Sequence, residues 1–495
     1  MPTCKIRYNG SIAELSGLDN RTSDILAQRL TVINQTKLRA SQSSYSKRVL
    51  PIEEYTTVLF DRKLNLIPTG LMSRVVKLLE ELEYQVEIAS VNPLLKPVDV
   101  ELPSYLRDYQ IAGIKSGLTS PRGIWQMPTG SGKSISAAAF ISHFPNAHVL
   151  FTVPFQKLAV QTRKVLNEYL KEPVGLVGAG KHEWQRVTVG VVNSLVTAAN
   201  NKEPALQNIQ VHIIDECHFA GSASYLTLTQ SLSNVQYAIG LSATPKRNDG
   251  CELIMEACCG EITYQTMDED VANIGAINLP TYIQLPIANR YTRESKPEPS
   301  NTSSLNLNEI LKLYKYSISQ NADRNMAVVK VVNSLLNLPS RQGNILVLFE
   351  YIEHGETLVD LLGQHKITAP LVHGKTKKSV ATKTVEDFKD LRIPLMVGSR
   401  VFKEGIDLPN LEFIVFAGAA SSDVSHWQYI GRVLRTNSSY TKTRSVVIDF
   451  KDGDNYFGRR SARREQFVID RYNKSCSHLA YSIPEMLKIT ESKLA

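Results

Sequence analysis

The segment Met127–Ser134, which reads Met-Pro-Thr-Gly-Ser-Gly-Lys-Ser, constrains the fold of this chain more than any other feature. A glycine-rich loop of this kind can hold phosphate oxygens only between a strand and the start of a helix, where backbone N–H groups converge. The apolar residues Gly123–Gln126 before the loop and the alanine-rich residues Ile135–Ile141 after it supply that context. The loop therefore predicts a parallel α/β domain with a nucleotide phosphate site, although Met127 replaces the first glycine of the usual pattern.

A second glycine-rich segment, Gly175–His182, fits the pattern G-x-x-x-x-G-K better at its first position. It ends in His182, where a phosphate loop needs a hydroxyl group to bind Mg²⁺. The charged and bulky residues Glu183 and Trp184 follow, where a buried helix would be needed. We therefore interpret this segment as a glycine loop that does not bind nucleotide.

An acidic segment supplies the remaining chemistry of a nucleotide site. Ile213–His218 ends an apolar strand with two carboxylates, Asp215 and Glu216. In a site of this kind Lys133 would reach the β- and γ-phosphates, and Ser134 and Asp215 would bind Mg²⁺. Glu216 would orient the attacking water and accept its proton. The segment therefore predicts ATP hydrolysis with Lys133, Asp215 and Glu216 as catalytic residues.

Three segments in a fixed order resemble motifs of the superfamily 2 helicases. Pro128–Ser134, Asp215–His218 and Ser242–Thr244 are similar to motifs I, II and III, and Leu106–Gln110 is similar to the adenine-reading segment before them. The resemblance implies ATP and Mg²⁺ as cofactors and an α/β fold of two tandem RecA-like parallel-sheet domains after a small N-terminal α+β domain. The ATP-binding residues that it implies here are Arg107, Gln110, Pro128, Thr129, Gly130, Ser131, Gly132, Lys133 and Ser134.

The second half of the chain continues this resemblance. Val397–Pro409 resembles motif V, and Gln428–Arg435 matches the pattern Q-x-x-G-R-x-x-R of motif VI. The residues added to the nucleotide site by this resemblance are Gly405, Asp407, Gln428, Arg432 and Arg435. The two arginines would act as arginine fingers and Gln428 would lie near the γ-phosphate, because a planar guanidinium offers several donors to the phosphoryl oxygens.

Loop residues with amide, hydroxyl or cationic groups predict contacts with a nucleic-acid backbone. Such contacts are independent of base sequence and sensitive to salt. The candidate residues are Pro154, Ser194, Ser242, Thr244, His373, Gly374 and Ser399. For His373, a structural role in the core or at the surface is an equal alternative.

The particular residues in these motifs resemble one branch of the superfamily. Asp-Glu-Cys-His at Asp215–His218, a DECH box, disfavours the commonest RNA helicases, and Phe402–Pro409 is similar to the branch with the phage UvsW-type and XPB-type DNA helicases. That resemblance implies a helicase that remodels forks or Holliday junctions by branch migration and unwinds DNA, with 3′→5′ polarity, in replication, recombination or repair. Its partner would be single-stranded, duplex or branched DNA, bound without sequence preference.

The same residues are also compatible with other functions. The chain could be an ATP-driven duplex translocase without strand separation, or an RNA helicase. A third class is a nucleotide-gated binding protein with negligible turnover, which an intact Glu216 disfavours. No motif identifies a wedge for strand separation.

Changes in pattern along the 495 residues predict five parts. They are an α+β domain at 1–95, an α/β domain at 96–288, a linker at 289–305, a second α/β domain at 306–450 and a helical tail at 451–495; the resemblance implies that both α/β domains are RecA-like. The first fifty residues hold eight basic and three acidic side chains, which suggests duplex DNA binding by the N-terminal domain. In the tail, Arg459, Arg460, Arg463 and Arg464 are predicted on one side of a helix, either as a solvated face or as a nucleic-acid contact.

Composition excludes several other classes of protein. Apolar residues make up 43% and charged residues 21%, which is ordinary for a folded chain, and the net charge is +8. The six cysteines form no C-x-x-C pair, so no structural metal and no disulfide framework are expected. The chain has no apolar run of membrane-spanning length and no secretory pattern at its start. We expect a monomer without a membrane partner, in the cytoplasm, which is the host cytoplasm if the protein is phage-encoded.

Overall fold

The computed structural model describes residues 1–41, 51–91, 93, 95–247, 249–274, 278–287, 307–399, 408, 410–419, 444–453, 456–472 and 474–492. The chain forms two compact units, the first of Met1–Pro128 and Gly132–Met267 and the second of Thr129–Ser131 and Asp268–Ala495. Among the described residues, no helix combines the length and the apolar character that crossing a membrane requires.

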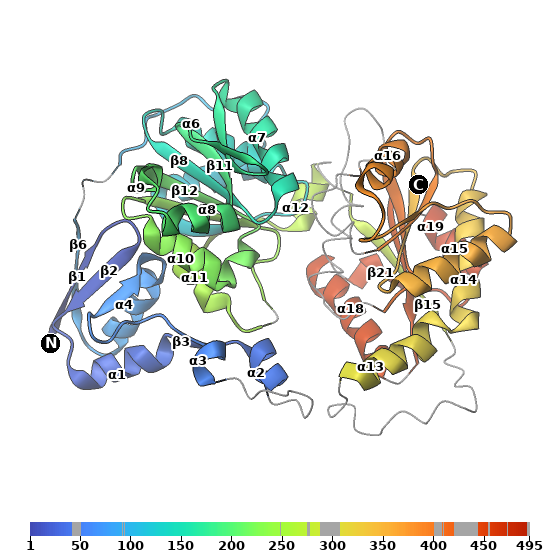
Figure 1. The fold of residues 1–495 in the computed structure, drawn as a ribbon, viewed down its shortest axis with the longest axis horizontal. Helices are drawn as coiled ribbons and strands as arrows, with labels where there is room; N and C mark the ends of the chain where they lie inside the picture. The colour runs from blue at the N-terminus through green and yellow to red at the C-terminus, as the bar shows by residue number, and fades with distance from the viewer. Residues whose placement is uncertain are drawn as a thin grey trace. The chain divides into compact units, whose positions relative to one another are not determined.

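The N-terminal part of the first unit is a small α+β element (Figure 1). Its four-stranded sheet has the order β5-β2-β1-β6, with β1 (Thr3–Tyr8), β2 (Ile12–Ser16), β5 (Leu66–Pro68) and β6 (Gln85–Ser90). Helices α1 (Asn20–Arg29) and α4 (Met72–Glu81) cover one face, because β1 alternates buried Cys4 and Ile6 with exposed Lys5 and Arg7.

A second, smaller sheet is inserted between β2 and β5. Strands β3 (Thr31–Ile33) and β4 (Thr56–Val58) pair antiparallel. Helices α2 (Gln35–Ser41) and α3 (Ile52–Tyr55) lie between them in sequence. We call the described residues from Thr31 to Val58 the ribbon element.

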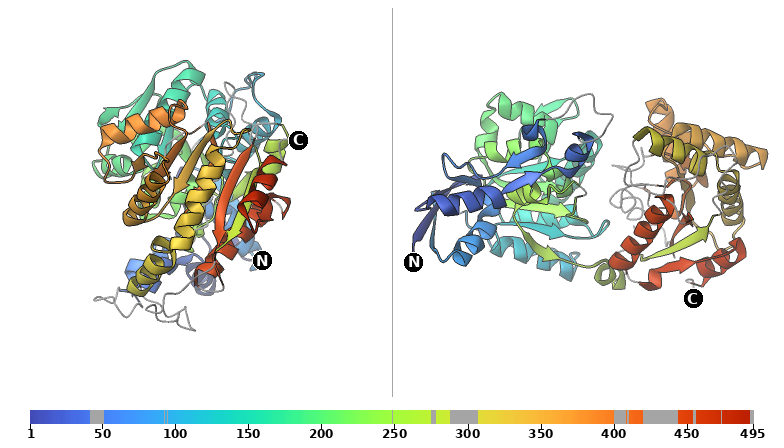
Figure 2. Two further views of the ribbon diagram at one scale, coloured as in Figure 1. Left: turned by 90° about the vertical axis from the view of Figure 1, so that its right-hand side faces the viewer. Right: turned by 90° about the horizontal axis from the view of Figure 1, so that it is seen from below.

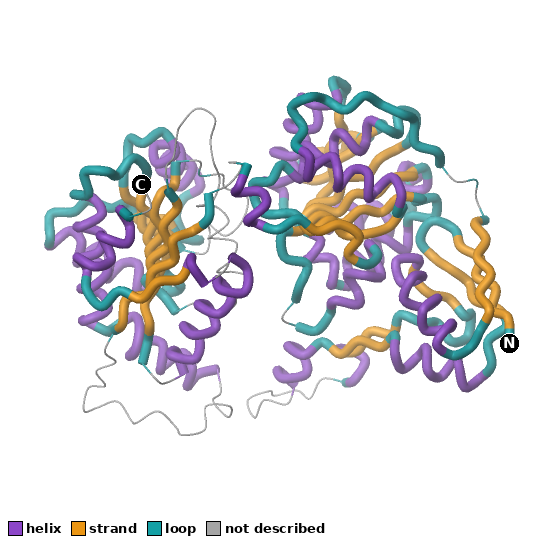
Figure 3. Tube along the Cα trace, turned by 180° about the vertical axis from the view of Figure 1, so that it is seen from behind, coloured by secondary structure: helices purple, strands orange, loops and turns teal. Residues whose placement is uncertain are grey.

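The rest of the first unit is built on an eight-stranded sheet in the order β10-β9-β11-β8-β12-β13-β7-β14 (Figure 3). All pairs are parallel except β10 with β9. The strands are β7 (Arg122–Gln126), β8 (His148–Val153), β9 (Val174–Gly178), β10 (Lys181–Glu183), β11 (Val187–Val191), β12 (Ile209–Asp215), β13 (Tyr237–Ser242) and β14 (Ile262–Gln265).

Helices cover both faces of this sheet, which is why its central strands are apolar throughout. On one face lie α5 (Asp108–Thr119), α6 (Lys133–Ser142) and α7 (Gln156–Leu170). On the other lie α8 (Val192–Asn200), α9 (Pro204–Gln207), the 3₁₀ turn η2 (Cys217–Gly221), α10 (Ala223–Ser231) and α11 (Glu252–Cys259).

The N-terminal element is fixed to this sheet domain by close backbone contacts. The Gly10 N–H donates to the Ser233 carbonyl at 2.9 Å, and a Cβ atom at Gly10 would overlap the Val235 backbone. Arg74 forms a bidentate ion pair with Glu256 of α11, with Nε 2.6 Å from Oε1. Apolar residues of α11 complete the core under the small sheet, so the two parts share one interior.

The second unit is a seven-stranded, wholly parallel sheet in the order β17-β18-β16-β19-β20-β15-β21. The strands are β15 (Pro280–Pro286), β16 (Asn344–Leu348), β17 (Leu371–Val372), β18 (Leu395–Gly398), β19 (Leu411–Phe416), β20 (Ser445–Lys451) and β21 (Ser477–Leu479). The helices are α12 (Asp268–Asn273), α13 (Leu307–Tyr314) with a π-helical turn (Lys315–Ser319), α14 (Ala322–Leu336), α15 (Ile352–Gln364), α16 (Lys378–Lys389), α18 (Tyr456–Tyr472), the 3₁₀ turn η6 (Lys474–Cys476) and α19 (Ile483–Glu491). Helices α14, α15 and α19 pack on one face and α18 on the other (Figure 2).

Two of the predicted domain boundaries are wrong. Strand β15 falls inside 96–288, which we assigned to the first RecA-like domain, but it pairs with β20 and β21 of the second sheet. The segment 451–495 is not a helical tail, because β21 is an edge strand of that sheet and α19 packs on its core. Both errors arise because the strand partners lie far away in sequence. The predicted linker 289–305 lies outside the described residues.

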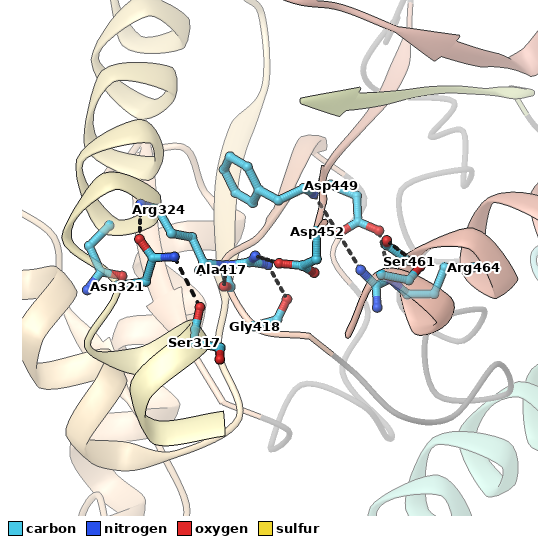
Figure 4. Close-up of polar contacts among 12 residues, drawn as sticks. Ser317, Asn321, Arg324, Ala417, Gly418, Asp449, Asp452, Ser461 and Arg464 are labelled. Carbon is cyan, nitrogen blue, oxygen red and sulfur yellow. Dashed lines mark hydrogen bonds and ion pairs between the residues drawn. The ribbon is translucent and has the colours of Figure 1, made fainter. Parts of the chain in front are cut away.

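Buried arginines hold the second sheet to its helices (Figure 4). Arg464 of α18 pairs with Asp449 of β20, with Nε 2.7 Å from Oδ2, and Tyr282 of β15 donates to the same carboxylate at 2.5 Å. Arg324 of α14 pairs with Asp452 at 2.5 Å. Because these charges are desolvated, each needs its partner to remain in the interior.

The predicted grouping of the tail arginines is therefore wrong at one position. Arg459 and Arg463 are exposed, and Arg460 lies over the Tyr456 ring at 4.3 Å. Arg464 has turned into the core, with 1% of its side chain exposed. Helical spacing alone could not predict that Arg464 is buried, because its acceptor Asp449 belongs to a different element, strand β20.

Replacing Arg464 with Gln should destabilise the second unit by about 3–5 kcal/mol, because Asp449 would keep a buried charge without its partner. The midpoint of urea unfolding, followed by circular dichroism, measures the loss. Arg463→Gln, which removes an exposed guanidinium from the same helix, is the matched control and should change stability by less than about 0.5 kcal/mol. Equal midpoints for both variants would contradict a structural role for the ion pair.

Candidate functional site

The loop between β7 and α6 has the geometry of a phosphate cradle. Strand β7 ends at Gln126, as the sequence predicted, and α6 begins at Lys133, two residues before the predicted helical stretch Ile135–Ile141. Gly130 and Gly132 have φ angles of +85° and +83°, which side chains with a Cβ atom rarely adopt. Gly132 is also the N-cap of α6 and gives no side-chain cap, so the first N–H groups of the helix remain available for an anion.

The predicted adenine-reading segment is held against this loop. The Gln110 side chain is buried in the first turn of α5, and its Oε1 accepts the Arg107 N–H at 2.9 Å. A Cβ atom at Gly132 would overlap Nε2 of Gln110. The structure therefore brings Gln110 and the phosphate loop together, while the Arg107 side chain is exposed.

The two predicted acidic residues lie at the end of β12, two strands from β7. Burial raises the pKa of the Asp215 carboxyl to about 7, and the charge of Glu216 adds to the shift, whereas Lys133 and the Glu216 N–H oppose it. A buried carboxylate beside a second carboxylate favours a bound cation. Glu216 itself has φ +48°, an unusual conformation for a residue other than glycine and typical of functional sites.

The Lys133 ammonium lies over the loop that precedes it. Its Nζ donates to the carbonyls of Met127 and Pro128 at 3.3 and 3.2 Å. Lys133 also lowers the pKa of Asp215, which shows that the two charges lie within electrostatic reach. The structure thus assembles the catalytic residues that were predicted within the first unit.

A polar chain connects Glu216 with the end of β13. His218 Nδ1 lies 3.4 Å from Glu216 Oε2 and 3.3 Å from Ser242 Oγ, and the Thr244 N–H donates to Ser242 Oγ at 3.1 Å. Ser242 is fully buried, so the predicted contact of its side chain with nucleic acid is wrong. Its hydroxyl links motif II to motif III. This role could not be predicted without knowing where His218 lies.

The remaining nucleic-acid candidates of the first unit follow other strands of the same sheet. Pro154 comes directly after β8, and Ser194 lies in the first turn of α8, after β11. The Gly175–His182 segment forms a hairpin turn between β9 and β10 rather than the start of a helix. At its turn, the Cβ position of Gly178 lies 3.2 Å from Ser194 Oγ. The sequence analysis did not predict this proximity. The signal in the sequence was the pair Gly178 and Gly180, both of which have positive φ angles in the structure.

In the second unit, His373, Gly374 and Ser399 are also brought together. Strands β17 and β18 pair at Val372 and Gly398, and the Ser399 N–H donates to the Val372 carbonyl at 3.0 Å. The Lys375 N–H donates to His373 Nδ1 at 3.2 Å, and a Cβ atom at Gly374 would meet open space. The motif V and VI candidates Gly405, Asp407, Gln428, Arg432 and Arg435 lie outside the described residues.

Two family models and several curated proteins are similar to this chain. Residues 104–247 match the family model "Type III restriction enzyme, res subunit", and residues 327–437 match "Helicase conserved C-terminal domain". The chain is 28% identical to the DNA 3'-5' translocase XPB2 of Sulfurisphaera tokodaii over 72% of this chain and 84% of that protein. It is 24% identical to the ATP-dependent DNA helicase uvsW of Enterobacteria phage T4 over 74% of this chain and 72% of that protein.

A comparison of structures shows the same fold. Dbp5 of S. cerevisiae, solved with RNA and ADP BeF3, superposes with a TM-score of 0.54 over 78% of this chain and 93% of that chain, at 16% identity. The tandem RecA-like fold that the sequence predicted is therefore confirmed.

Fold, phosphate loop and family models together define an ATP-hydrolysing helicase of superfamily 2. Within that superfamily, the chain is similar to the branch that contains the UvsW and XPB helicases, which confirms the resemblance drawn from the motifs.

Gly132→Ala should weaken ATP binding by about tenfold or more, because the new Cβ atom meets Gln110 and a positive φ strains any residue other than glycine. Titration with a fluorescent ATP analogue measures the dissociation constant. Gly363→Ala, at an exposed helical glycine with open space around it, is the control and should bind ATP normally. Normal affinity in Gly132→Ala would show that this loop does not hold the phosphates.

Proposed function

We propose that the chain is an ATP-dependent DNA helicase that translocates on and remodels branched DNA, with fork or junction branch migration as its main activity. The polar chain Glu216–His218–Ser242–Thr244 carries this proposal, because it joins the hydrolytic carboxylate to a loop beside the candidate nucleic-acid contacts. The printed names of two relatives, a DNA 3'-5' translocase and an ATP-dependent DNA helicase, support DNA as the substrate and 3′→5′ as the direction.

The residues present fit ATP with Mg²⁺. The amides at the start of α6 would bind phosphate oxygens, Lys133 would exchange its loop carbonyls for the β- and γ-phosphates, and Ser134 with Asp215 would hold the metal. Mg²⁺, when bound, would neutralise charge on the phosphates. Glu216 would orient the attacking water and accept its proton. Gln428, Arg432 and Arg435 would complete the site from motif VI.

The nucleic-acid path would follow the carboxyl ends of the strands. Ser194 and Thr244 in the first unit, and Gly374 and Ser399 in the second, offer N–H groups or hydroxyls rather than base-reading groups. His373 adds an imidazole, whereas Pro154 has no N–H group and marks the start of its loop. We add the turn Gly178–Gly180 to this path, because it adjoins Ser194. Binding should then be independent of sequence and should weaken with salt.

The N-terminal element would bind duplex through its helices rather than its sheet. On the exposed face of the sheet, Lys5 pairs with Glu87 at 3.4 Å, and Arg7 stands opposite Glu14. Arg29 at the end of α1 and Lys37 in α2 are exposed and form no ion pair with any other described residue. These two cations flank strand β3, and Lys37 Nζ also donates to the Glu54 carbonyl at 3.0 Å.

A second candidate function is duplex translocation without strand separation. The word translocase in the name of the Sulfurisphaera tokodaii relative favours it, and no described residue has been identified as a wedge. The two candidates share the ATP site and differ only in whether strands separate.

The first test is ATP hydrolysis without nucleic acid and with single-stranded DNA, duplex DNA, a four-way junction or RNA, at matched low salt. The junction should stimulate hydrolysis most, and strand-displacement assays then separate a helicase from a translocase. Glu216→Gln should retain ATP binding and lose turnover by at least about a hundredfold, whereas Glu168→Gln, at an exposed helical glutamate, should behave as wild type. Strongest stimulation by RNA would contradict DNA remodelling.

The double variant Arg29→Gln/Lys37→Gln should weaken duplex binding and flatten its salt dependence, because each lost phosphate contact lowers the slope by about one. Fluorescence anisotropy at several salt concentrations measures both. Lys5→Gln/Arg7→Gln removes the same charge from the sheet face and should leave affinity unchanged. Point variants test this role more cleanly than a truncation would, because removing the N-terminal element would uncover the core that it shares with α11. Equal losses in both double variants would contradict a specific role for the ribbon element.

A further inference from the structure

Arg247 follows motif III and forms an ion pair that the proposed chemistry does not use. Its Nε lies 2.8 Å from Asp249 Oδ1 and its Nη2 2.5 Å from Oδ2, a bidentate arrangement. Its third nitrogen, Nη1, donates to the backbone carbonyl of His218. One guanidinium therefore holds both Asp249 and the residue that contacts Glu216.

The protein leaves space for this guanidinium beside motif II. A Cβ atom at Gly221, the last residue of η2, would overlap Nε of Arg247. The Arg247 N–H also donates to Glu252 Oε1 at 2.8 Å, which fixes the backbone from which the side chain extends. The Arg247 and Asp249 side chains are 19% and 16% exposed, so solvent screens their attraction little.

The same ion pair reaches the N-terminal ribbon element. Asn34 Nδ2 lies 3.4 Å from Asp249 Oδ2 and 3.4 Å from Cys251 Sγ, and the Gln35 N–H donates to the Asp249 carbonyl at 2.9 Å. Asn34 follows β3, and its Oδ1 accepts the Lys37 N–H at 2.9 Å at the start of α2. A continuous polar path thus runs from the ribbon element through Asp249, Arg247 and His218 to Glu216.

We propose that Arg247 is a positioning residue that couples the ribbon element to motif II, so that DNA bound at the ribbon element accelerates ATP hydrolysis. This inference rests on the proposed function, in which the ribbon element contacts duplex. A shift of the start of α2 moves the Asp249 carboxylate through the Asn34 side chain. Arg247 is shared between Asp249 and the His218 carbonyl, so the shift reaches the turn that carries Glu216.

The coupling is tested by Asn34→Ser, because serine keeps the cap of α2 but is too short to reach Asp249. Basal ATP turnover should be unchanged, and stimulation by duplex or junction DNA should fall roughly fivefold, the lower range of allosteric coupling. Asn20→Ser, the same change at an exposed position of α1, should keep full stimulation. Equal stimulation of Asn34→Ser and wild type would overturn the coupling alone. A wild-type rate that no nucleic acid raises would overturn the proposed function and the coupling with it.

Arg247→Gln tests the positioning role without nucleic acid. The maximal basal rate, kcat, should fall roughly tenfold while KM for ATP stays within about twofold, because the variant misplaces the turn with Glu216 and leaves the phosphate loop intact. If Arg247 had only a structural role, the variant would have a lower urea midpoint but would not show a lower kcat at nearly constant KM. In the double variant Asn34→Ser/Arg247→Gln, the stimulated rate should equal that of Arg247→Gln, since both changes interrupt one path. Additive losses would overturn the proposal.

Discussion

Parallel strand pairing is the constraint on which the site of this protein depends. In the first sheet β7, β13 and β12 are neighbours, and they end at Gln126, Ser242 and Asp215. Because parallel strands point the same way, the loops after them lie along one edge. The phosphate loop, the acidic pair and motif III therefore meet without any long side chain having to reach across the domain. The same rule places His373 beside Ser399 in the second sheet.

Buried carboxylates have different roles in the two units, depending on whether an arginine pairs with them. Asp449 and Asp452 are each held by an arginine, and Asp449 also accepts from Tyr282, so their charge is compensated within the fold. Asp215 is equally buried but has a like-charged neighbour in Glu216, and its pKa rises to about 7. Within the protein only Lys133 and the Glu216 N–H oppose this rise, and we propose that a bound cation supplies the rest of the compensation. The first arrangement stabilises a sheet, and the second prepares a site.

Local signals predicted where the candidate residues of the first unit lie in the fold, and non-local pairing accounts for the errors. Lys133 and Asp215 stand at strand ends that short apolar runs reveal, and their order along the chain carried the family resemblance. The same apolar runs predicted the tandem parallel-sheet fold, which the structure confirmed. Strand β15 was assigned to the wrong sheet because its partners are β20 and β21, and the burial of Arg464 depends on an aspartate in a strand. Ser242 carries a hydroxyl suited to nucleic acid, but His218 and the Thr244 N–H surround it.

The position of β15 in the second sheet also has a consequence for biosynthesis. This strand is apolar and buried between β20 and β21, yet it leaves the ribosome before every other strand of its sheet. Translation proceeds at roughly 5–20 residues per second, so the interval between Pro286 and Ser445 lasts on the order of 10–30 s. Throughout that interval the nascent chain carries an unpaired strand with both edges open. The second sheet can thus be completed only after β20 and β21 have been synthesised.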